Sequence, residues 1–163
     1  MERKVKRKLI LFRSKYGSTK EYIKELAERI QGDCVISDAK NFAGNLKDYN
    51  LIILGSCTYM GRIMIVDFIK KNKQILKRRK VYLFVVGLIP EDNEASKQSF
   101  ELIPEEIRKN LLGYRKFPGR INITKLNFFE RMILKMTKAK MEDLVDYSQV
   151  DLVIEDLKES GLL

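Results

Sequence analysis

Two short and almost wholly apolar runs most strongly limit the folds open to this chain. They are Leu51 to Leu54 and Val81 to Val86, and a glycine follows each of them. Strands buried on both faces have such sequences, because helices cover both sides of a parallel sheet. A half-exposed strand would alternate apolar and polar residues instead. The two runs therefore predict the centre of a parallel α/β sheet.

The rest of the chain alternates between strand-like and helical patterns. Further strands are expected at Lys8 to Phe12, Cys34 to Ser37 and Tyr114 to Phe117. The alternation predicts right-handed crossovers with helices on both faces of the sheet. Ser148 is the expected N-cap of the last helix, with Asp151 three residues later as in a capping box. The helical patterns occupy Lys20 to Ile30, roughly Ile63 to Leu76, roughly Ala95 to Leu112 with a break before Pro104, and Gln149 to Lys158.

The charge of the chain predicts an anionic partner. At 163 residues it fits a single domain, residues 1–163, and its net charge is +10. Nucleic acid, acidic lipid headgroups and a carboxylate-bearing substrate all suit such a charge, and solubility alone is the simpler explanation. The basic residues are dispersed and form no recognition motif, so no nucleic-acid role is expected.

The reactive side chains exclude several chemistries. The chain has no histidine and only two cysteines, Cys34 and Cys57, in different expected elements. No zinc, haem or other metal site is therefore predicted, although a magnesium site made only of carboxylates stays open. Reduced cysteines suit the cytoplasm. The apolar run after the basic N-terminus is too short for a signal peptide, and no run is long enough to span a membrane.

A hydroxyl-rich loop, Phe12 to Thr19, follows the first expected strand and leads into a helix. Free backbone N–H groups and the positive end of the helix dipole favour an anion at such a place. Ser14, Ser18 and Thr19 add hydroxyl donors. Gly17 lacks the Cβ that would block a close backbone approach. The loop therefore predicts a phosphate site.

Two later loops are expected at the same edge of the sheet. They are Gly55 to Gly61 after the third strand and Gly87 to Asn93 after the fourth. Ligands of open parallel sheets bind at the carboxyl ends of the strands, near the point where the strand order reverses. These loops are therefore candidates to hold the remainder of a phosphate-bearing ligand.

The motifs narrow that ligand to a mononucleotide with a flat ring. No Gly-Lys-Ser/Thr follows Gly17, as a Walker loop would require, and the first turn has one glycine where a dinucleotide fingerprint has three. Tyr59 could stack on a flat ring across the second and third loops, or be a rim residue without a ligand. Cys57 as a nucleophile is a further alternative, although no histidine can activate it.

An insertion, residues 120–147, interrupts the alternation after the fifth strand. It is far longer than a simple connection between a strand and a helix. Leu126, Phe129, Ile133 and Met136 fall on one helical face, which Phe128 and Met132 widen. Between residues 115 and 140 there are eight Lys or Arg and a single acid. The segment is either a helix docked on the core or a surface for a partner, a membrane or a lipophilic substrate.

The chain resembles the flavodoxin family over about residues 8 to 160. Ser14 to Thr19 resembles that family's FMN phosphate loop, and the glycine-bracketed second loop resembles the loop flanking its isoalloxazine ring. The resemblance implies FMN and a flavodoxin-like, three-layer, doubly wound α/β fold with five parallel strands in the order 2-1-3-4-5. It implies no catalytic side chain, since the flavin carries the chemistry. The implied cofactor-binding residues are Ser14, Lys15, Tyr16, Gly17, Ser18, Thr19, Ser56, Cys57, Thr58, Tyr59, Met60, Gly61, Gly87 and Leu88.

Three segments carry a closer resemblance. Phe117-Pro118-Gly119, Phe128 to Thr137 and Asp146-Tyr147 are similar to the flavodoxin-type, menaquinone-dependent protoporphyrinogen IX oxidases. This resemblance implies a tetrapyrrole substrate and a quinone acceptor. It agrees with a cytoplasmic protein that touches the inner face of the membrane through its basic insertion.

Three functions follow from these observations. The first is an FMN enzyme that oxidises a large, apolar, carboxylate-bearing substrate. The second is a flavodoxin-type electron carrier that docks a redox partner protein, although the charge of +10 would require that partner to be acidic. The third is a flavodoxin-like module that has lost its flavin and acts as a binding protein.

Overall fold

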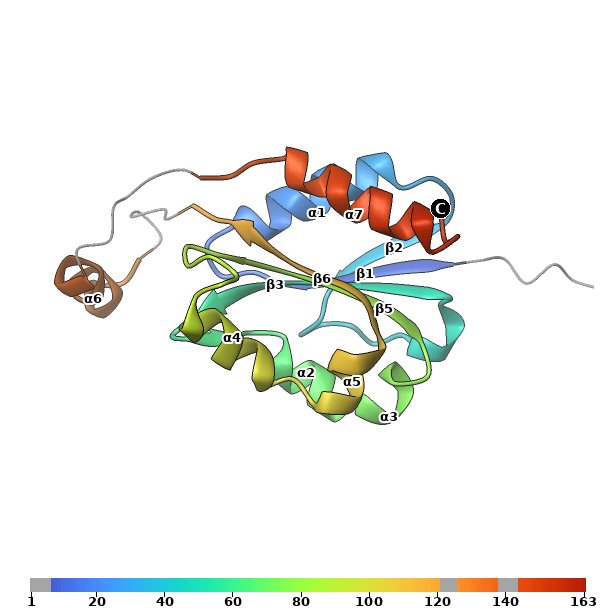
Figure 1. Cartoon of the computed structure of the whole chain (residues 1–163), viewed down its shortest axis with the longest axis horizontal. Helices are drawn as coiled ribbons and strands as arrows, with labels where there is room; N and C mark the ends of the chain where they lie inside the picture. The colour runs from blue at the N-terminus through green and yellow to red at the C-terminus, as the bar shows by residue number, and fades with distance from the viewer. Residues whose placement is uncertain (1–6, 121–125, 138–143) are drawn as a thin grey trace, which may run out of the picture.

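The computed structural model describes residues 7–120, 126–137 and 144–163, and its centre is a parallel sheet (Figure 1). The strands run in the order β2-β1-β3-β5-β6, and every pair of neighbours in that row is parallel. This confirms the predicted order, because β5 and β6 are the fourth and fifth parallel strands along the chain. The strands are β1 (Lys8–Arg13), β2 (Cys34–Asp38), β3 (Leu51–Tyr59), β5 (Lys80–Gly87) and β6 (Leu111–Pro118).

Helices cover both faces of the sheet. In Figure 1, α1 and α7 lie above it, and α2, α3, α4 and α5 lie below it. A 3-10 turn precedes β3, and α6 lies apart from both layers. The bounds are α1 (Ser18–Arg29), η1 (Leu46–Asp48), α2 (Val66–Lys71), α3 (Lys73–Leu76), α4 (Glu94–Glu101), α5 (Glu105–Asn110), α6 (Phe128–Thr137) and α7 (Ser148–Glu159).

The central strands are buried on both faces, as their sequences predict. Along β3, Ile52 and Leu54 pack into the apolar cluster on the α2–α5 side, while Leu51 and Ile53 pack into the cluster on the α1–α7 side. All four are at most 2% exposed. Burial of this kind is the main favourable contribution to the stability of such a domain.

The single helix expected from Ile63 to Leu76 is wrong. Ile63 belongs to a short strand, β4 (Arg62–Ile63), which pairs antiparallel with the end of β3. Helix begins only at Val66 and breaks at Asn72 into α2 and α3. The Asn72 side-chain amide donates to the Phe68 carbonyl, 2.9 Å away, and so competes with the helical hydrogen bonds there.

Two further boundaries differ from the prediction. The fifth parallel strand begins at Leu111 and not at Tyr114, because its pairing with β5 starts at Val81 and overrides the helical pattern. Ser148 is the first residue of α7, and its N–H donates to Asp146 Oδ1 at 3.0 Å. The capping side chain is therefore Asp146, two residues before the expected one.

The insertion leaves and re-enters the body at one place beside α1. The Leu144 N–H donates to the Gly119 carbonyl at 3.2 Å. The Tyr22 hydroxyl, on α1, donates to the Pro118 carbonyl at 2.6 Å and accepts from the Asp146 N–H at 2.9 Å. These contacts close the base of the insertion. Residues 1–6, 121–125 and 138–143 fall outside the described part of the chain.

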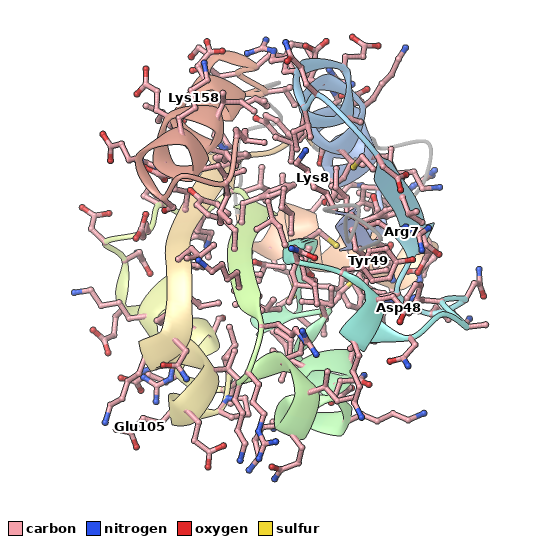
Figure 2. The ribbon with its side chains drawn as sticks, turned by 90° about the vertical axis from the view of Figure 1, so that its right-hand side faces the viewer. Arg7, Lys8, Asp48, Tyr49, Glu105 and Lys158 are labelled. Carbon is pink, nitrogen blue, oxygen red and sulfur yellow. The ribbon has the colours of Figure 1, made fainter. Side chains whose placement is uncertain are left out.

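The two edges of the sheet have different surroundings. The carboxyl ends of the strands point toward α6 (Figure 1). Figure 2 faces the opposite end, where Arg7 precedes the first strand, which begins at Lys8, and lies near Tyr49. There the Arg7 guanidinium carbon lies 5.2 Å from the centroid of the Tyr49 ring.

Candidate functional site

The predicted phosphate loop connects β1 to the N-terminus of α1. Gly17 has φ 98° and ψ −19°, a left-handed conformation that disfavours residues with a Cβ. The Gly17 N–H donates to Ser14 Oγ at 3.2 Å, which folds the loop back on itself. No side chain caps α1, so its first N–H groups remain available to a ligand. The geometry is that of an anion site.

Thr19 supplies an independent sign of a ligand. The residue is wholly buried in the first turn of α1, beside the largely buried Ser18. Its hydroxyl oxygen is one of the few buried side-chain atoms in the described residues that lack a hydrogen-bond partner. Such a group costs free energy unless a partner arrives. A phosphate oxygen at the helix N-terminus would be such a partner.

The second predicted loop is a β-hairpin. Thr58 pairs with Ile63 and Tyr59 with Arg62, so only Met60 and Gly61 form the turn. Both have positive φ, 51° and 72°, as a type I′ turn requires. Of the expected loop, Gly55 to Gly61, the residues up to Tyr59 are therefore strand, and Met60 projects at the tip with 65% of its surface exposed. Ser99 of α4 donates to the Gly61 carbonyl at 2.6 Å and fixes the turn.

Ser56 and Cys57 are held within the base of that hairpin. Ser56 Oγ accepts from the Ile65 N–H and donates to the Cys57 carbonyl, each at 3.1 Å. The Cys57 thiol lies 3.1 Å from the Met64 sulfur. Burial raises the pKa of the Cys57 thiol above its ordinary value. A thiol kept protonated is a poor nucleophile, which disfavours the alternative of cysteine catalysis.

Thr58 and Gly87 lie side by side where β3 and β5 end. A Cβ at Gly87 would lie 3.3 Å from Thr58 Oγ1 and 3.1 Å from Lys116 Cε. The Thr58 hydroxyl is a second buried oxygen without a hydrogen-bond partner in the described residues. Leu88, the next residue of the third loop, is exposed. The glycine thus keeps the floor of this edge open beside an available hydroxyl.

A polar cluster joins the phosphate loop, the hairpin and the insertion. Glu130 of α6 lies with Oε1 2.7 Å from Lys15 Nζ and accepts from the Tyr59 hydroxyl at 2.9 Å. Lys15 Nζ also lies 3.6 Å from the centroid of the Tyr59 ring. The rings of Tyr16 and Tyr59 meet edge to face, with centroids 6.3 Å apart. We call Lys15, Tyr59 and Glu130 the latch.

The charges of the latch stabilise one another. The hydrogen bond to Lys15 lowers the pKa of the Glu130 carboxyl, and the same bond raises the pKa of Lys15. Desolvation, followed by the nearby Glu130 charge, raises the pKa of Tyr16 to about 12. Glu130 is only 7% exposed. Near neutral pH Glu130 and Lys15 therefore form a carboxylate–ammonium pair beside the neutral Tyr16.

Glu130 was absent from the sequence-based site, although the sequence carries a sign of it. Its N–H donates to Asn127 Oδ1 at 2.8 Å, and the Asn127 N–H donates back to Glu130 Oε2 at 3.1 Å. This reciprocal pair is a capping box, and Asn-x-x-Glu before an apolar run predicts it. One carboxylate oxygen thus starts α6 while the other attaches the helix to the two loops.

The structure brings the predicted residues to one edge of the sheet in two groups. Ser14 to Thr19 surround the N-terminus of α1. Thr58 to Gly61 and Gly87-Leu88 lie at the ends of β3 and β5. Lys15 and Tyr59 connect the groups directly. Such an arrangement can hold a phosphate at one end and a flat ring at the other.

Comparisons with known proteins agree with this arrangement. A family model described as a flavodoxin domain matches residues 9–148. Since it covers well over half of the chain, the protein belongs to the flavodoxin domain family. A comparison with curated proteins finds no match.

Solved structures share the fold at low sequence identity. Oxidised flavodoxin 1 from Bacillus cereus has a TM-score of 0.53 and 17% identity over 82% of this chain and 99% of its own. A Fusobacterium nucleatum flavodoxin bound to flavin mononucleotide has a TM-score of 0.51 and 14% identity over 95% and 98%. A flavoprotein from Lactobacillus acidophilus NCFM, in complex with FMN, has a TM-score of 0.51 and 19% identity over 69% and 93%.

Proposed function

We propose that this protein is an FMN-dependent oxidoreductase that acts on a lipophilic small molecule. Membership in the flavodoxin domain family and the two FMN-bound structural neighbours support the cofactor. The unpartnered, buried Thr19 hydroxyl at the N-terminus of α1 supports it independently. The residues present therefore fit FMN.

The chain would hold FMN from its phosphate to its ring. Ser14 to Thr19 would bind the phosphate through backbone N–H groups and hydroxyls. Tyr59 and Met60, together with Gly87 and Leu88, would line the ring. When bound, the flavin would supply the redox chemistry, so that no side chain has to act as an acid or base. The side chains would bind, orient and exclude water.

The position of α6 is the observation that most favours an enzyme over an electron carrier. The latch holds this helix against the phosphate loop and the hairpin, while aromatic and methionine side chains of the helix stay exposed. An apolar, basic surface beside the flavin loops suits a large apolar substrate with carboxylates. Protoporphyrinogen IX, with a quinone as electron acceptor, is the candidate pair that best matches this chemistry.

Turnover by the FMN-loaded protein tests the proposal. Protoporphyrinogen oxidation would be followed with menaquinone present, against free FMN at the same concentration and against protein without FMN. We expect turnover well above both backgrounds and dependent on the quinone. Oxidation no faster than with free FMN would refute this substrate pair.

A flavodoxin-type electron carrier is the second candidate. The flavodoxins among the structural neighbours favour it, while the net charge of +10 requires an acidic partner. Fast, salt-sensitive reduction by a ferredoxin-type reductase, without turnover of small molecules, would favour the carrier. Purified protein that is colourless and fails to quench the fluorescence of added FMN would favour a module that has lost its flavin.

A further inference from the structure

We propose that α6 docks the protein on an anionic lipid surface. The proposal names a partner for the proposed function and therefore rests on it. It places the flavin edge of the sheet next to the bilayer, where a lipophilic electron acceptor would be found.

The apolar side chains of α6 are exposed. Phe128 is 83% exposed, Met136 77%, Phe129 59% and Met132 41%. Helix α6 has only ten residues, so these four side chains make up much of its surface. Large exposed apolar patches mark interaction sites in soluble domains. Of the two alternatives for the insertion, a helix docked on the core and a surface for a partner, the exposure of these four side chains disfavours the first.

The charge of α6 toward the solvent is positive. Arg131 and Lys135 are exposed. Glu130 is the only acid in the helix, and the latch buries it against Lys15 and Tyr59. The latch therefore keeps the one negative charge of α6 away from an approaching anionic surface. What remains outside is apolar and cationic, which is complementary to anionic lipid headgroups over acyl chains.

The dimensions of α6 favour a helix that lies on the bilayer. Ten residues make a helix about 15 Å long, roughly half the thickness of the hydrocarbon core. Among the described residues, no helix is long and apolar enough to cross a membrane. Short amphipathic helices with aromatic residues and flanking cations bind in the plane of the interface.

The molecule also has a second basic surface, which the test must distinguish from α6. Lys77, Arg78, Arg79 and Lys80 follow one another between α3 and the body of β5, at the end of the sheet away from α6. Nitrogen-tipped side chains gather at the lower edge of this end in Figure 2. Among the described residues, α3 beside this surface has no exposed large apolar side chain, so the surface offers mainly charge. Because the two surfaces lie at opposite ends of the long axis (Figure 1), one flat bilayer cannot contact both.

Vesicle co-sedimentation of the full chain, with and without FMN, tests the proposal. Vesicles of phosphatidylcholine alone are compared with vesicles containing about one third phosphatidylglycerol. We expect binding to the anionic vesicles that persists in part at high salt, because apolar burial does not depend on salt.

Matched variants locate the surface. The double variant Phe128→Ser/Met136→Ser should lower vesicle affinity by roughly tenfold or more. Arg131→Gln/Lys135→Gln should lower it about fivefold per cation removed. The control Ile36→Ser/Leu102→Ser removes two exposed apolar side chains elsewhere and should leave affinity unchanged. The control Lys77→Gln/Arg78→Gln removes two cations at the opposite end and should also leave it unchanged.

The outcomes separate this proposal from the proposed function. Absence of vesicle binding, or binding lost with Lys77→Gln/Arg78→Gln but retained with the α6 variants, would overturn lipid docking. Stoichiometric capture of an acidic protein partner by α6, without any vesicle binding, would also overturn it. Turnover by a protein that does not bind vesicles would refute lipid docking and leave the proposed function standing. Vesicle binding without turnover would support docking and refute the proposed substrate pair.

Discussion

The sheet and the insertion are held in place by different forces. The central strands are held by apolar side chains buried on both faces. The described part of the insertion, in contrast, buries few apolar side chains, among them Leu126 and Val145, and polar contacts also attach it to the body. These are the Tyr22 hydroxyl and the Arg120–Glu21 ion pair at its base and the latch on α6. Apolar burial is strong and insensitive to pH, whereas polar contacts near the surface contribute little free energy and respond to pH and salt.

This difference separates stability from function in the molecule. The sheet sets the free energy of unfolding and the positions of the loops at its carboxyl edge. The insertion sets what can approach those loops. Changes in the sheet should therefore unfold the protein, and changes in the insertion should alter binding while the domain stays folded.

The largest effect is expected in the sheet. Leu54→Ala should lower the free energy of unfolding by about 2–5 kcal/mol, because Leu54 is wholly buried and the cavity cannot refill. Urea unfolding measures this change. Leu102→Ala is the matched control, since Leu102 is 43% exposed and should cost no more than about 0.5 kcal/mol. Equal costs for the two variants would contradict the assignment of stability to the sheet.

The phosphate loop should show opposite effects on stability and binding. Thr19→Val keeps the shape of the side chain and removes a buried hydroxyl without a partner. The FMN-free protein should be as stable as the parent or more so. FMN affinity, measured by fluorescence quenching, should fall about tenfold or more, because a hydrogen bond to a charged group contributes about 1.5–3 kcal/mol.

A control variant at Ser160, just after α7, tests whether the loss of FMN affinity is specific to the phosphate loop. Ser160→Ala removes a hydroxyl that donates to the Asp156 carbonyl at 2.9 Å, far along the chain from the loop. It should leave FMN affinity unchanged. An unchanged affinity for Thr19→Val as well would show that the loop is not the phosphate site.

A change at the base of the insertion should lower the stability of the domain less than a change in the sheet, and it should also loosen the insertion. Tyr22→Phe leaves the ring in the core but removes the hydroxyl shared by Pro118 and Asp146. Unfolding free energy should fall by about 1–2 kcal/mol. Limited trypsin digestion should cut the insertion faster while the sheet stays protected. Cleavage at the parental rate would show that this hydroxyl does not hold the insertion.

The two central strands were predictable because every residue of their apolar runs is buried in the structure. Leu51 to Leu54 and Val81 to Val86 are buried on both faces, and the single glycine of the first turn agrees with the phosphate loop. Local pattern and final environment coincide in these segments. The strand order followed only from the resemblance to a known family.

The hairpin turn and the latch could not be predicted from the spacing of residue types in the sequence. Met60 adopts a positive φ that a methionine rarely takes, so the Met-Gly turn lacks the usual Asn-Gly signal. Tyr59 and Glu130 are 71 residues apart, and their hydrogen bond depends on how the insertion returns to the body. The Asn-x-x-Glu spacing from Asn127 to Glu130 is enough to predict the capping box. It does not predict that the Glu130 carboxylate contacts the phosphate loop and the hairpin.

Changes at the latch should have the smallest effect on the free energy of unfolding. They should have the clearest effect on the attachment of α6 to the body. The pKa of Glu130 is lowered in the folded protein, so its contribution is complete above the ordinary carboxyl value of 4.5 and is lost as the pH falls through the lowered pKa. The pKa of Lys15 is raised, so its contribution is complete below the ordinary value of 10.5 and is lost only above it. The latch should therefore stay closed across the neutral range and open in acid.

Glu130→Gln isolates the charge from the helix cap, because glutamine also serves in a capping box. Helix α6 should still begin at Phe128, and the unfolding midpoint should hardly change. Backbone NMR shifts of Asn127 and Glu130, followed from about pH 7 to about pH 3, should show an acid transition below the ordinary carboxyl range in the parent. The same transition in the variant would mean that another group controls it. Protonation of Glu130 releases α6 from Lys15 and Tyr59, so vesicle binding should also change in acid in the parent and not in the variant.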